Sequence, residues 1–407
     1  MIRNKGQFIS LMVIVIAMPI IALSLTFSQG MSGYGEGIGS MTRTKSAYYY
    51  YSSVENDLER AGGIIGERAT VAALDRVVET GQGLDRAELR LKELFLNGTL
   101  YGNRSSIMND STIYDWLERT EQISRRRGFI LDFSLKDVEV TMANSYQIGF
   151  RLNYTLTLRD KTGVFSLEKS KVKTCSVPLS GLEDPLITSR TGGRLVYFIE
   201  RSPHQSNFTR YLGSGDGNNS WTAGRSVVLS SEESRIESVS DKEDRVLVTN
   251  SSVDPDLMNQ FAGVVIGEDV EMGGFDKPYV ENFGDLSPVS NGTRIVVDGN
   301  NSEVWEIENL YRNWRESYYI SGQGPSFLDR LENNLTNSYP GKGLTLLIKK
   351  EDLEDADITI EDRSNLDHIY FSDESLNNYK VKGMPTSFLI NEEHREELGL
   401  NNDLAFA

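Results

Sequence analysis

The side chains in this sequence that could carry chemistry are mostly carboxylates. Seven of them gather near the C-terminal end, and carboxylate oxygens are the ligands that Ca²⁺ prefers: Glu351, Asp352, Glu354, Asp355, Asp357, Glu361 and Asp362. The run lacks the regular alternation and the glycine of a calcium-binding loop, so we interpret it as a solvated acidic face. The segment SGDGNNS at 214–220 is interpreted as a surface loop. We therefore predict no metal site.

Histidine and cysteine are scarce in the chain. His204, His368 and His394 each stand among polar residues, without a second histidine at the spacing of metal ligands. Cys175 is the one cysteine, and the alternation of VKTCSV around it predicts a small buried residue without nucleophilic reactivity. The motifs GxSxG, HExxH, GxxxxGK[ST] and CxxC do not occur. We predict no catalytic residue and no cofactor.

The N-terminal segment is the strongest single pattern in the sequence. Residues 8–27 carry no charge and are mostly Leu, Ile, Val, Met, Phe and Ala, which is the length and composition of a transmembrane helix. Arg3 and Lys5 precede this run, and the first charge after it is Glu36. This asymmetry places the N-terminus in the cytoplasm and everything after about Gln29 outside the cell. We expect a single-pass protein of the cell membrane that contacts lipid through residues 8–27.

Charge and sequons agree with an external location. The net charge of −17 argues against nucleic acid as a partner. Asn-x-Ser/Thr acceptors are more frequent than chance would give, which predicts a glycosylated surface. The acceptors are Asn97, Asn103, Asn109, Asn153, Asn207, Asn218, Asn250, Asn291, Asn300 and Asn334. A single cysteine is unusual for an animal or plant ectodomain of this size, so the combination favours an archaeal cell surface.

Lys5-Gly6-Gln7, followed directly by the apolar run, resembles the class III signal segment of archaeal type IV pilin-like proteins. The resemblance implies that a prepilin peptidase cuts after Gly6, so that the chain begins at Gln7 and its apolar helix remains as anchor or filament core. The segments SVPLSGLEDPL, GPSFLDRLENNL and VKGMPTSFLINEEH look like those of large archaeal surface proteins of this kind, for which the resemblance implies no activity. Pilins that polymerise usually have a Glu where this chain has Leu11. We therefore expect an anchor, with other envelope or pilin-like subunits as candidate partners.

The remaining chain is predicted to fold as α+β, in two domains that follow a flexible spacer. Residues 1–29 form the cytoplasmic tip and anchor, and 30–45, which contain GYGEGIGS, form the spacer. A membrane-proximal domain at 46–186 combines helices with an antiparallel sheet, because 54–79 has helical periodicity and 148–158 alternates strictly. The four tyrosines at 48–51 are expected to begin the long helix and to pack on both of its sides, and Arg125 to Arg127 to end another helix.

The distal domain at 192–407 is predicted as mixed α/β. Short apolar runs favour buried strands: RLVYFI, SVVL, RVLVT, AGVVIG, RIVV, LTLLI, HIYF and SFLI. Asp254 and Pro255 predict a short helix between two of these strands, and Ser326 with Asp329 predicts a capping box at the start of another helix. Further helices are expected at 304–318 and 392–398.

Two hypotheses of function follow. The first is a non-catalytic, membrane-anchored protein of the cell envelope, whose glycosylated ectodomain has a structural or binding role. The second is a tethered extracellular enzyme or sensor that uses carboxylates such as Asp216 or Asp298 in a cleft of the distal domain. A deep apolar cleft with converging carboxylates would favour the second.

Overall fold

The fold is that of a computed structural model, and the described residues form mixed α+β structure. The described residues are 3–163, 165–204, 210–211, 226–249, 251–266, 279–280, 295–297, 304–358, 362–372, 378–381, 384–385, 387–400 and 405–406, with the backbone alone for 3–40 and some short segments. They divide into two compact units. The first unit is Met1–Ala69, Leu91–Val140 and Gly149–Val177, and the second is Thr70–Arg90, Thr141–Ile148 and Pro178–Ala407. This division departs from the predicted boundaries at 46–186 and 192–407.

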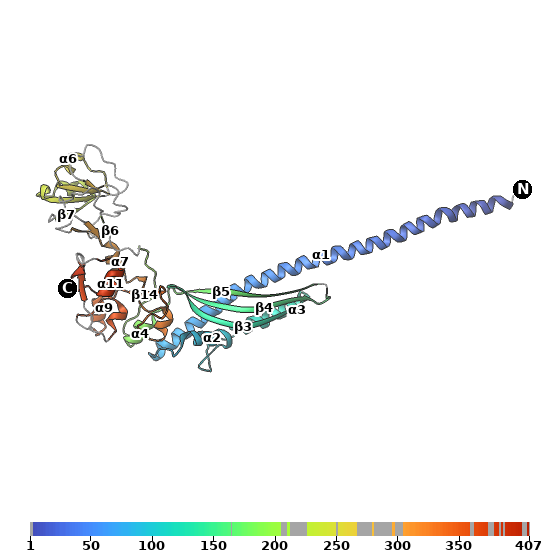
Figure 1. The fold of residues 1–407 in the computed structure, drawn as a ribbon, viewed down its shortest axis with the longest axis horizontal. Helices are drawn as coiled ribbons and strands as arrows, with labels where there is room; N and C mark the ends of the chain where they lie inside the picture. The colour runs from blue at the N-terminus through green and yellow to red at the C-terminus, as the bar shows by residue number, and fades with distance from the viewer. Residues whose placement is uncertain are drawn as a thin grey trace. The chain divides into compact units, whose positions relative to one another are not determined.

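One continuous helix, α1 (Arg3–Thr80), forms the N-terminal part of the chain (Figure 1). The predicted spacer at 30–45 lies inside this helix, so the expectation of a flexible link there is corrected. A glycine in a helix interior costs about 1 kcal/mol relative to alanine, which neighbouring helix formers can offset.

The predicted transmembrane helix is wrong. Within the part of the chain that the structure describes, no helix has both the length and the apolar character that a membrane crossing requires. The apolar run belongs to a 78-residue helix that continues through charged sequence.

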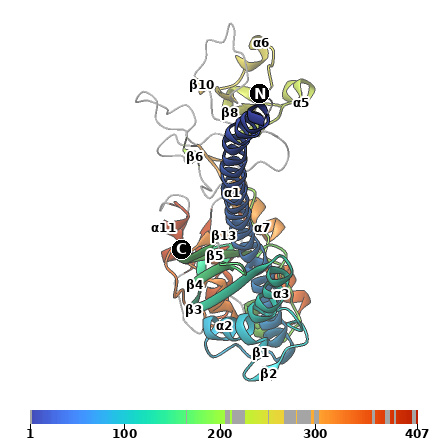
Figure 2. The same cartoon turned by 90° about the vertical axis from the view of Figure 1, so that its right-hand side faces the viewer.

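The first unit packs α1 against a three-stranded sheet of β3 (Phe129–Asn144), β4 (Gln147–Asp160) and β5 (Ser166–Pro178), in that order. Figures 1 and 2 show these strands beside the later part of α1. A two-residue turn joins β3 to β4, which makes the pair antiparallel. The alternation that predicted β4 is confirmed, because one side chain in two points into the core and is fully buried: Ile148, Phe150, Leu152, Tyr154, Leu156 and Leu158.

The helix α3 (Ile113–Arg126) covers the same face of the sheet as α1. Its N-cap Thr112 and Asp115 form a capping box, and its last turn holds two of the predicted terminal arginines. Trp116 donates from its indole N–H to Asp57 of α1 at 2.9 Å, and its ring meets Phe133 of β3 edge to face. The unit is completed by α2 (Ala87–Asn97) from Leu91 onward and by the two-residue strands β1 (Thr99–Leu100) and β2 (Asn103–Arg104).

Small side chains set the distance between α1 and the sheet. A Cβ atom on Gly62 would lie 2.4 Å from the Sγ atom of Cys175 in β5, whereas one on Gly63 would meet nothing closer than 3.8 Å.

The tyrosines at 48–51 do not pack on both sides of the helix in the way that the sequence predicted. Tyr50 and Tyr51 are buried, while Tyr48 and Tyr49 are exposed, so the group packs on one side of the helix only.

The second unit contains a parallel sheet in the order β10, β9, β8, β7. Its strands are β7 (Ser226–Leu229), β8 (Arg245–Thr249), β9 (Gly263–Ile266) and β10 (Tyr279–Val280). The helix α6 (Pro255–Met258) connects β8 to β9, and Asp254 caps it by accepting from the Asp256 N–H, as the sequence predicts. The helix α5 (Glu233–Glu237) and the 3-10 turn η1 (Lys242–Asp244) connect β7 to β8.

The remaining described elements belong to this second unit, and some of them position the candidate site. They are α4 (Pro185–Arg190), β6 (Arg210–Tyr211), β11 (Ile295–Val297), β12 (Val304–Glu306), α7 (Glu308–Glu316), β13 (Tyr319–Gly322), α8 (Phe327–Leu331), β14 (Gly343–Leu346), α9 (Lys350–Asp355), α10 (Asp367–Tyr370), β15 (Asn378–Val381), β16 (Leu389–Asn391), α11 (Glu392–Glu397) and β17 (Ala405–Phe406). Three small antiparallel sheets form here: β13 with β14, β16-β15-β17 and β11-β12-β6.

Three local predictions in this unit are wrong. HIYF at 368–371 lies in and just after α10, because the N–H groups of Tyr370 and Phe371 donate to the oxygens of Leu366 and Asp367, four residues earlier. RLVYFI at 194–199 forms no strand and only one isolated bridge, between Glu183 and Phe198. The helix predicted at 304–318 is shorter, because 304–306 pair with β11 and β6 and the helix follows them. The predicted capping box of Ser326 and Asp329 is confirmed.

Candidate functional site

A buried set of charged groups lies at the centre of the second unit. Arg330 comes from α8, Asp184 stands just before α4, and Asp367 with His368 begins α10. The side chains of Arg330, Asp184 and Asp367 are each 0 % exposed. Burying a charge is costly unless it is paired and hydrogen-bonded, so the partners of these groups decide what the site is.

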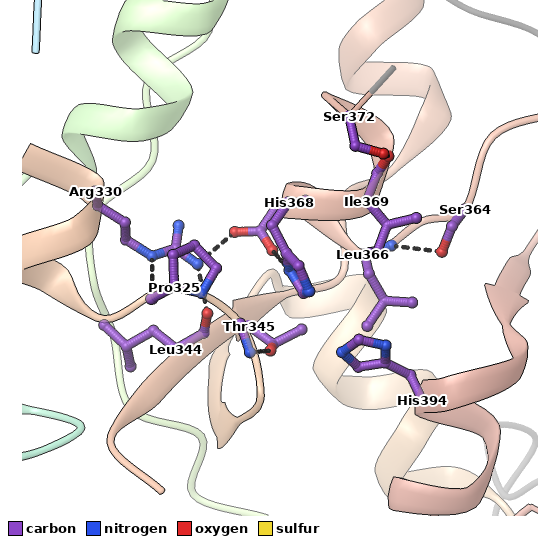
Figure 3. Close-up of polar contacts among 12 residues, drawn as sticks. Pro325, Arg330, Leu344, Thr345, Ser364, Leu366, His368, Ile369, Ser372 and His394 are labelled. Atoms are coloured by element: carbon purple, nitrogen blue, oxygen red, sulfur yellow. Dashed lines mark hydrogen bonds and ion pairs between the residues drawn. The ribbon is translucent and has the colours of Figure 1, made fainter. Parts of the chain in front are cut away.

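Backbone geometry holds Arg330 in place. Ser326 and Asp329 cap α8, and its preceding segment approaches β14 so closely that a Cβ on Gly324 would lie 2.2 Å from the Leu344 oxygen. This approach aligns two carbonyl groups with the guanidinium. Its Nε donates to the Pro325 oxygen at 3.1 Å and its Nη2 to the Leu344 oxygen at 2.5 Å (Figure 3).

Two carboxylates share this one guanidinium. The Arg330 Nη1 lies 2.6 Å from the Asp184 Oδ2, and its Nη2 lies 2.6 Å from the Asp367 Oδ2. Tyr319 also donates from its hydroxyl to the Asp184 Oδ2 at 2.6 Å. Burial acts to lower the pKa of Arg330, but the two carboxylates raise it above its ordinary value, so the group stays charged.

The pKa values of the two carboxyl groups are shifted in opposite directions. Burial raises the pKa of Asp184, against the effect of Arg330. Burial acts in the same direction on Asp367, but Arg330 and His368 bring its pKa down to about 2. Asp367 is therefore ionised near neutral pH, and its carboxylate also contacts His368, a neighbour that Asp184 lacks.

A short loop fixes the position of that neighbour. Asn365 connects the segment after β14 to β16: its Nδ2 donates to the Ile348 oxygen at 2.8 Å, and its Oδ1 accepts from the Leu389 N–H at 2.7 Å. The next residues enter α10. There the His368 Nδ1 lies 3.0 Å from the Asp367 Oδ1. Because an ionised carboxylate can only accept, this nitrogen carries the proton.

His394 approaches His368 from α11. The two ring centroids lie 5.0 Å apart, and Figure 3 shows both rings. Asn391 caps α11, and its Oδ1 accepts from the His394 backbone N–H at 3.2 Å and contacts the His394 Nδ1 at 2.7 Å. An oxygen that accepts from the backbone also accepts from the ring, so the His394 Nδ1 carries a proton.

This arrangement leaves the Nε2 atom of His394 as a buried acceptor without a hydrogen bond among the described residues. Burial, with His368 nearby, lowers the pKa of His394 to about 4, so the ring is neutral near neutral pH. Its proton is on Nδ1, and Nε2 therefore has a lone pair. Among the described residues that atom has no hydrogen-bond partner. The Glu397 Oε2 stands 3.6 Å from it, too far for a hydrogen bond.

These residues form part of the wall of a cavity of about 770 Å³. His368, His394, Glu393 and Glu397 line it together with polar side chains that include Thr336 and Asn337. Burial raises the pKa of Glu397, whose carboxylate also accepts from the Gln323 backbone N–H. The cavity thus combines carboxylates with a neutral imidazole, which is an arrangement suited to binding polar ligands or to proton transfer.

The predicted functional residues lie mostly elsewhere. Asp216, Asp298 and the loop at 214–220 fall outside the described residues, as do Asn207, Asn218, Asn250, Asn291 and Asn300. Four glycosylation candidates are exposed: Asn97, Asn103, Asn109 and Asn153. Asn334 is half-buried, and its Oδ1 accepts from the Thr336 N–H and hydroxyl. Gly6 and Gln7 lie in α1, where only the backbone is described.

Other candidates resemble their predicted state more closely. Cys175 is fully buried, and burial raises the pKa of its thiol to about 11, which disfavours the thiolate. The acidic run has its first four members in α9, of which Asp352 is half-buried. Among the described residues no group of three His, Cys, Asp or Glu is arranged to hold a metal ion.

Sequence reasoning missed the histidine pair and the buried ion network. His368 and His394 are 26 positions apart and were each interpreted alone, with no second histidine at ligand spacing. One weak signal was available, because Asp367 directly precedes His368 and Glu397 stands one helical turn after His394.

Comparison of the chain with models of protein families, with curated proteins and with solved structures gives no match. The function is therefore argued from the geometry alone.

Proposed function

We propose that this chain is a non-catalytic protein of the cell envelope, pilin-like at its N-terminus, whose second unit binds a small polar molecule. The observation that carries the binding role is the cavity of about 770 Å³, lined by His368, His394 and Glu397. Its wall is held by Asn365, Asn391 and the paired Arg330, so these side chains are positioned before a ligand arrives.

Support for the envelope location comes from the sequence. The signal-like start around Gly6, the net charge of −17 and the sequons favour an exterior location. Four of the sequon asparagines are exposed to a glycosyltransferase, whereas the amide of Asn334 is engaged by Thr336. We therefore expect glycans on Asn97, Asn103, Asn109 or Asn153 before Asn334.

A second function, acid–base catalysis, rests on one specific observation. The neutral His394 presents a lone pair on Nε2, and Glu397 stands 3.6 Å away with a raised pKa. Such a pair can hold and release a proton. This version of the enzyme hypothesis places the chemistry on Glu397 and His394 instead of Asp216 and Asp298.

Surface labelling of intact source cells tests the location. A membrane-impermeant amine reagent should modify exposed lysines such as Lys136 without lysis, while a cytoplasmic protein in the same sample stays unmodified. Sequencing the labelled chain should find Gln7 at its start and sugar on at least one exposed sequon. Labelling that requires lysis, together with unmodified sequons, would remove the envelope proposal.

A further inference from the structure

The charge around the cavity is one-sided. Glu393 and Glu397 stand in its wall, and among the described lining residues none is Lys or Arg. Behind the wall, Arg330 is shared by the two buried carboxyl groups of Asp184 and Asp367. An anionic ligand would meet these carboxylates without a cation to pair with, whereas a cation would be attracted.

The hydrogen-bonding groups of the cavity also favour a cationic ligand. The His394 Nε2 and the Glu397 Oε2 are both acceptors, and they lie 3.6 Å apart with no donor between them. An N–H group forms its best hydrogen bonds at about 2.9 Å, so one ammonium nitrogen can donate to both atoms at once. The unpartnered atom belongs to a side chain only 3 % exposed, and leaving a buried acceptor unsatisfied is costly.

The Glu397 carboxylate is positioned by the backbone beside it. Glu397 accepts from the Gln323 backbone N–H. Its Oε1 would lie 3.0 Å from a Cβ on Gly322, so the glycine leaves room for the group. Its side chain is 24 % exposed and lines the cavity, so a ligand in the cavity can reach it.

We propose that this cavity binds a small organic cation, with a primary ammonium group held by Glu397 and His394 and its uncharged part against the apolar lining residues Leu335, Pro340 and Ile369. The inference deepens the proposed binding role and rests on it. The chemistry specified is a free amine in its protonated form, carrying a chain of a few carbon atoms. Thr336 and Asn337, which also line the cavity, supply hydrogen bonds to further polar groups of the ligand.

Histidine NMR of the full-length protein provides a direct test. The chain has only 3 His, so ring-labelled histidine gives three imidazole signals, and the His394→Asn variant identifies one of them. The probe is n-propylammonium chloride near neutral pH, compared with n-propanol and sodium butyrate at matched ionic strength. We expect propylammonium to shift the His394 and His368 signals saturably, and the neutral and anionic probes to leave them unchanged.

Two glutamates of α11 provide a matched pair of variants. Glu397→Gln should weaken propylammonium binding by about tenfold, because it replaces a charge-assisted hydrogen bond with a neutral one. Glu396→Gln removes the same charge from an exposed neighbour outside the cavity wall and should change the affinity by less than about twofold. Circular dichroism establishes that both variants are folded.

The outcomes separate this inference from the binding role. If butyrate or propanol saturates the signals and propylammonium does not, the cavity binds ligands but the cation inference is overturned. If the Glu397→Gln and Glu396→Gln variants bind propylammonium equally, the ammonium site is not at Glu397 and the inference also fails. No saturable shift with any probe contradicts both the cation inference and the binding role.

Discussion

The two units bury very different interiors. In the first unit, the contact of α1 with β4 and β5 is made by apolar and aromatic side chains such as Leu58, Phe150 and Cys175. In the second unit, a guanidinium and two carboxyl groups are buried as completely as any leucine of the first. Apolar contacts tolerate small changes of partner, whereas a buried charge depends on a few specific atoms. Stability in the second unit should therefore be concentrated in fewer residues.

The largest expected effect is at Arg330. Arg330→Met keeps the length of the side chain but leaves the buried carboxyl groups of Asp184 and Asp367 without a cation. We expect the free energy of unfolding to fall by about 3–5 kcal/mol, measured by urea denaturation. Arg151→Met in the first unit is the control, because its 3.2 Å ion pair with Glu139 is about half exposed on each side. It should cost less than about 0.5 kcal/mol. Equal costs in the two units would break the comparison.

Because His394 is buried as a neutral ring, we expect the stability of the second unit to depend on pH in a way that the first unit does not share. The pKa of His394 falls from 6.5 to about 4 on folding, so its stabilising contribution is complete above 6.5 and is lost as the pH falls toward 4. The loss is roughly 3 kcal/mol.

Calorimetry through this pH interval should show the melting temperature falling in the wild type and falling less in His394→Asn. Glu397 acts in the opposite direction, because its raised pKa favours the folded state at lower pH. The difference between wild type and variant isolates the histidine. If the melting temperatures of the wild type and of His394→Asn fall equally with pH, His394 is not buried as a neutral ring.

Substitutions at two adjacent glycines of α1 should change the free energy of unfolding by smaller amounts and in opposite directions. Gly62→Ala places a Cβ 2.4 Å from the Cys175 Sγ, so we expect a loss of about 1–3 kcal/mol. Gly63→Ala meets only the Ser176 oxygen at 3.8 Å and should gain up to about 1 kcal/mol from helix propensity.

The double variant Gly62→Ala with Cys175→Ala sharpens this test. Removing the sulfur should restore part of the loss, measured as a coupling energy from the four unfolding free energies. The rescue should be incomplete, because the Cβ of residue 175 would still lie 3.2 Å away. Strictly additive losses would mean that the helix and sheet separate to accept the methyl group.

The smallest effects are expected at the two capping boxes, one in each unit. Thr112→Ala and Ser326→Ala each remove a side chain that accepts from the third residue of its helix, at a cost of about 1 kcal/mol. Ser326 should cost more, because Asp329 is only 2 % exposed and would lose the Ser326 hydroxyl inside the protein. Urea denaturation of both variants compares them, and an equal cost would show that burial does not change the strength of these caps.

Local patterns in the sequence predicted a good part of the fold. The alternation of 148–158 is found in β4, the capping box of Ser326 is found at α8, and Asp254 with Pro255 opens α6. These succeed because a period or a cap involves residues a few positions apart. The expectation for HIYF failed because apolar composition alone does not decide between helix and strand. The expectation for 30–45 failed because its glycines were interpreted as a flexible link, whereas α1 continues through them.

Sequence alone therefore determined the buried face of elements such as β4, and it predicted that the single cysteine is buried. Tertiary structure decided the site. Asp184, Arg330 and Asp367 are separated by long stretches of chain, and nothing in their neighbouring residues shows that they would meet. Their pairing depends on the approach of Gly324 to β14 and on the loop at Asn365. Electrostatic partners act through space, so a charge that looks solvated in the sequence can become the centre of a buried network once the chain is packed.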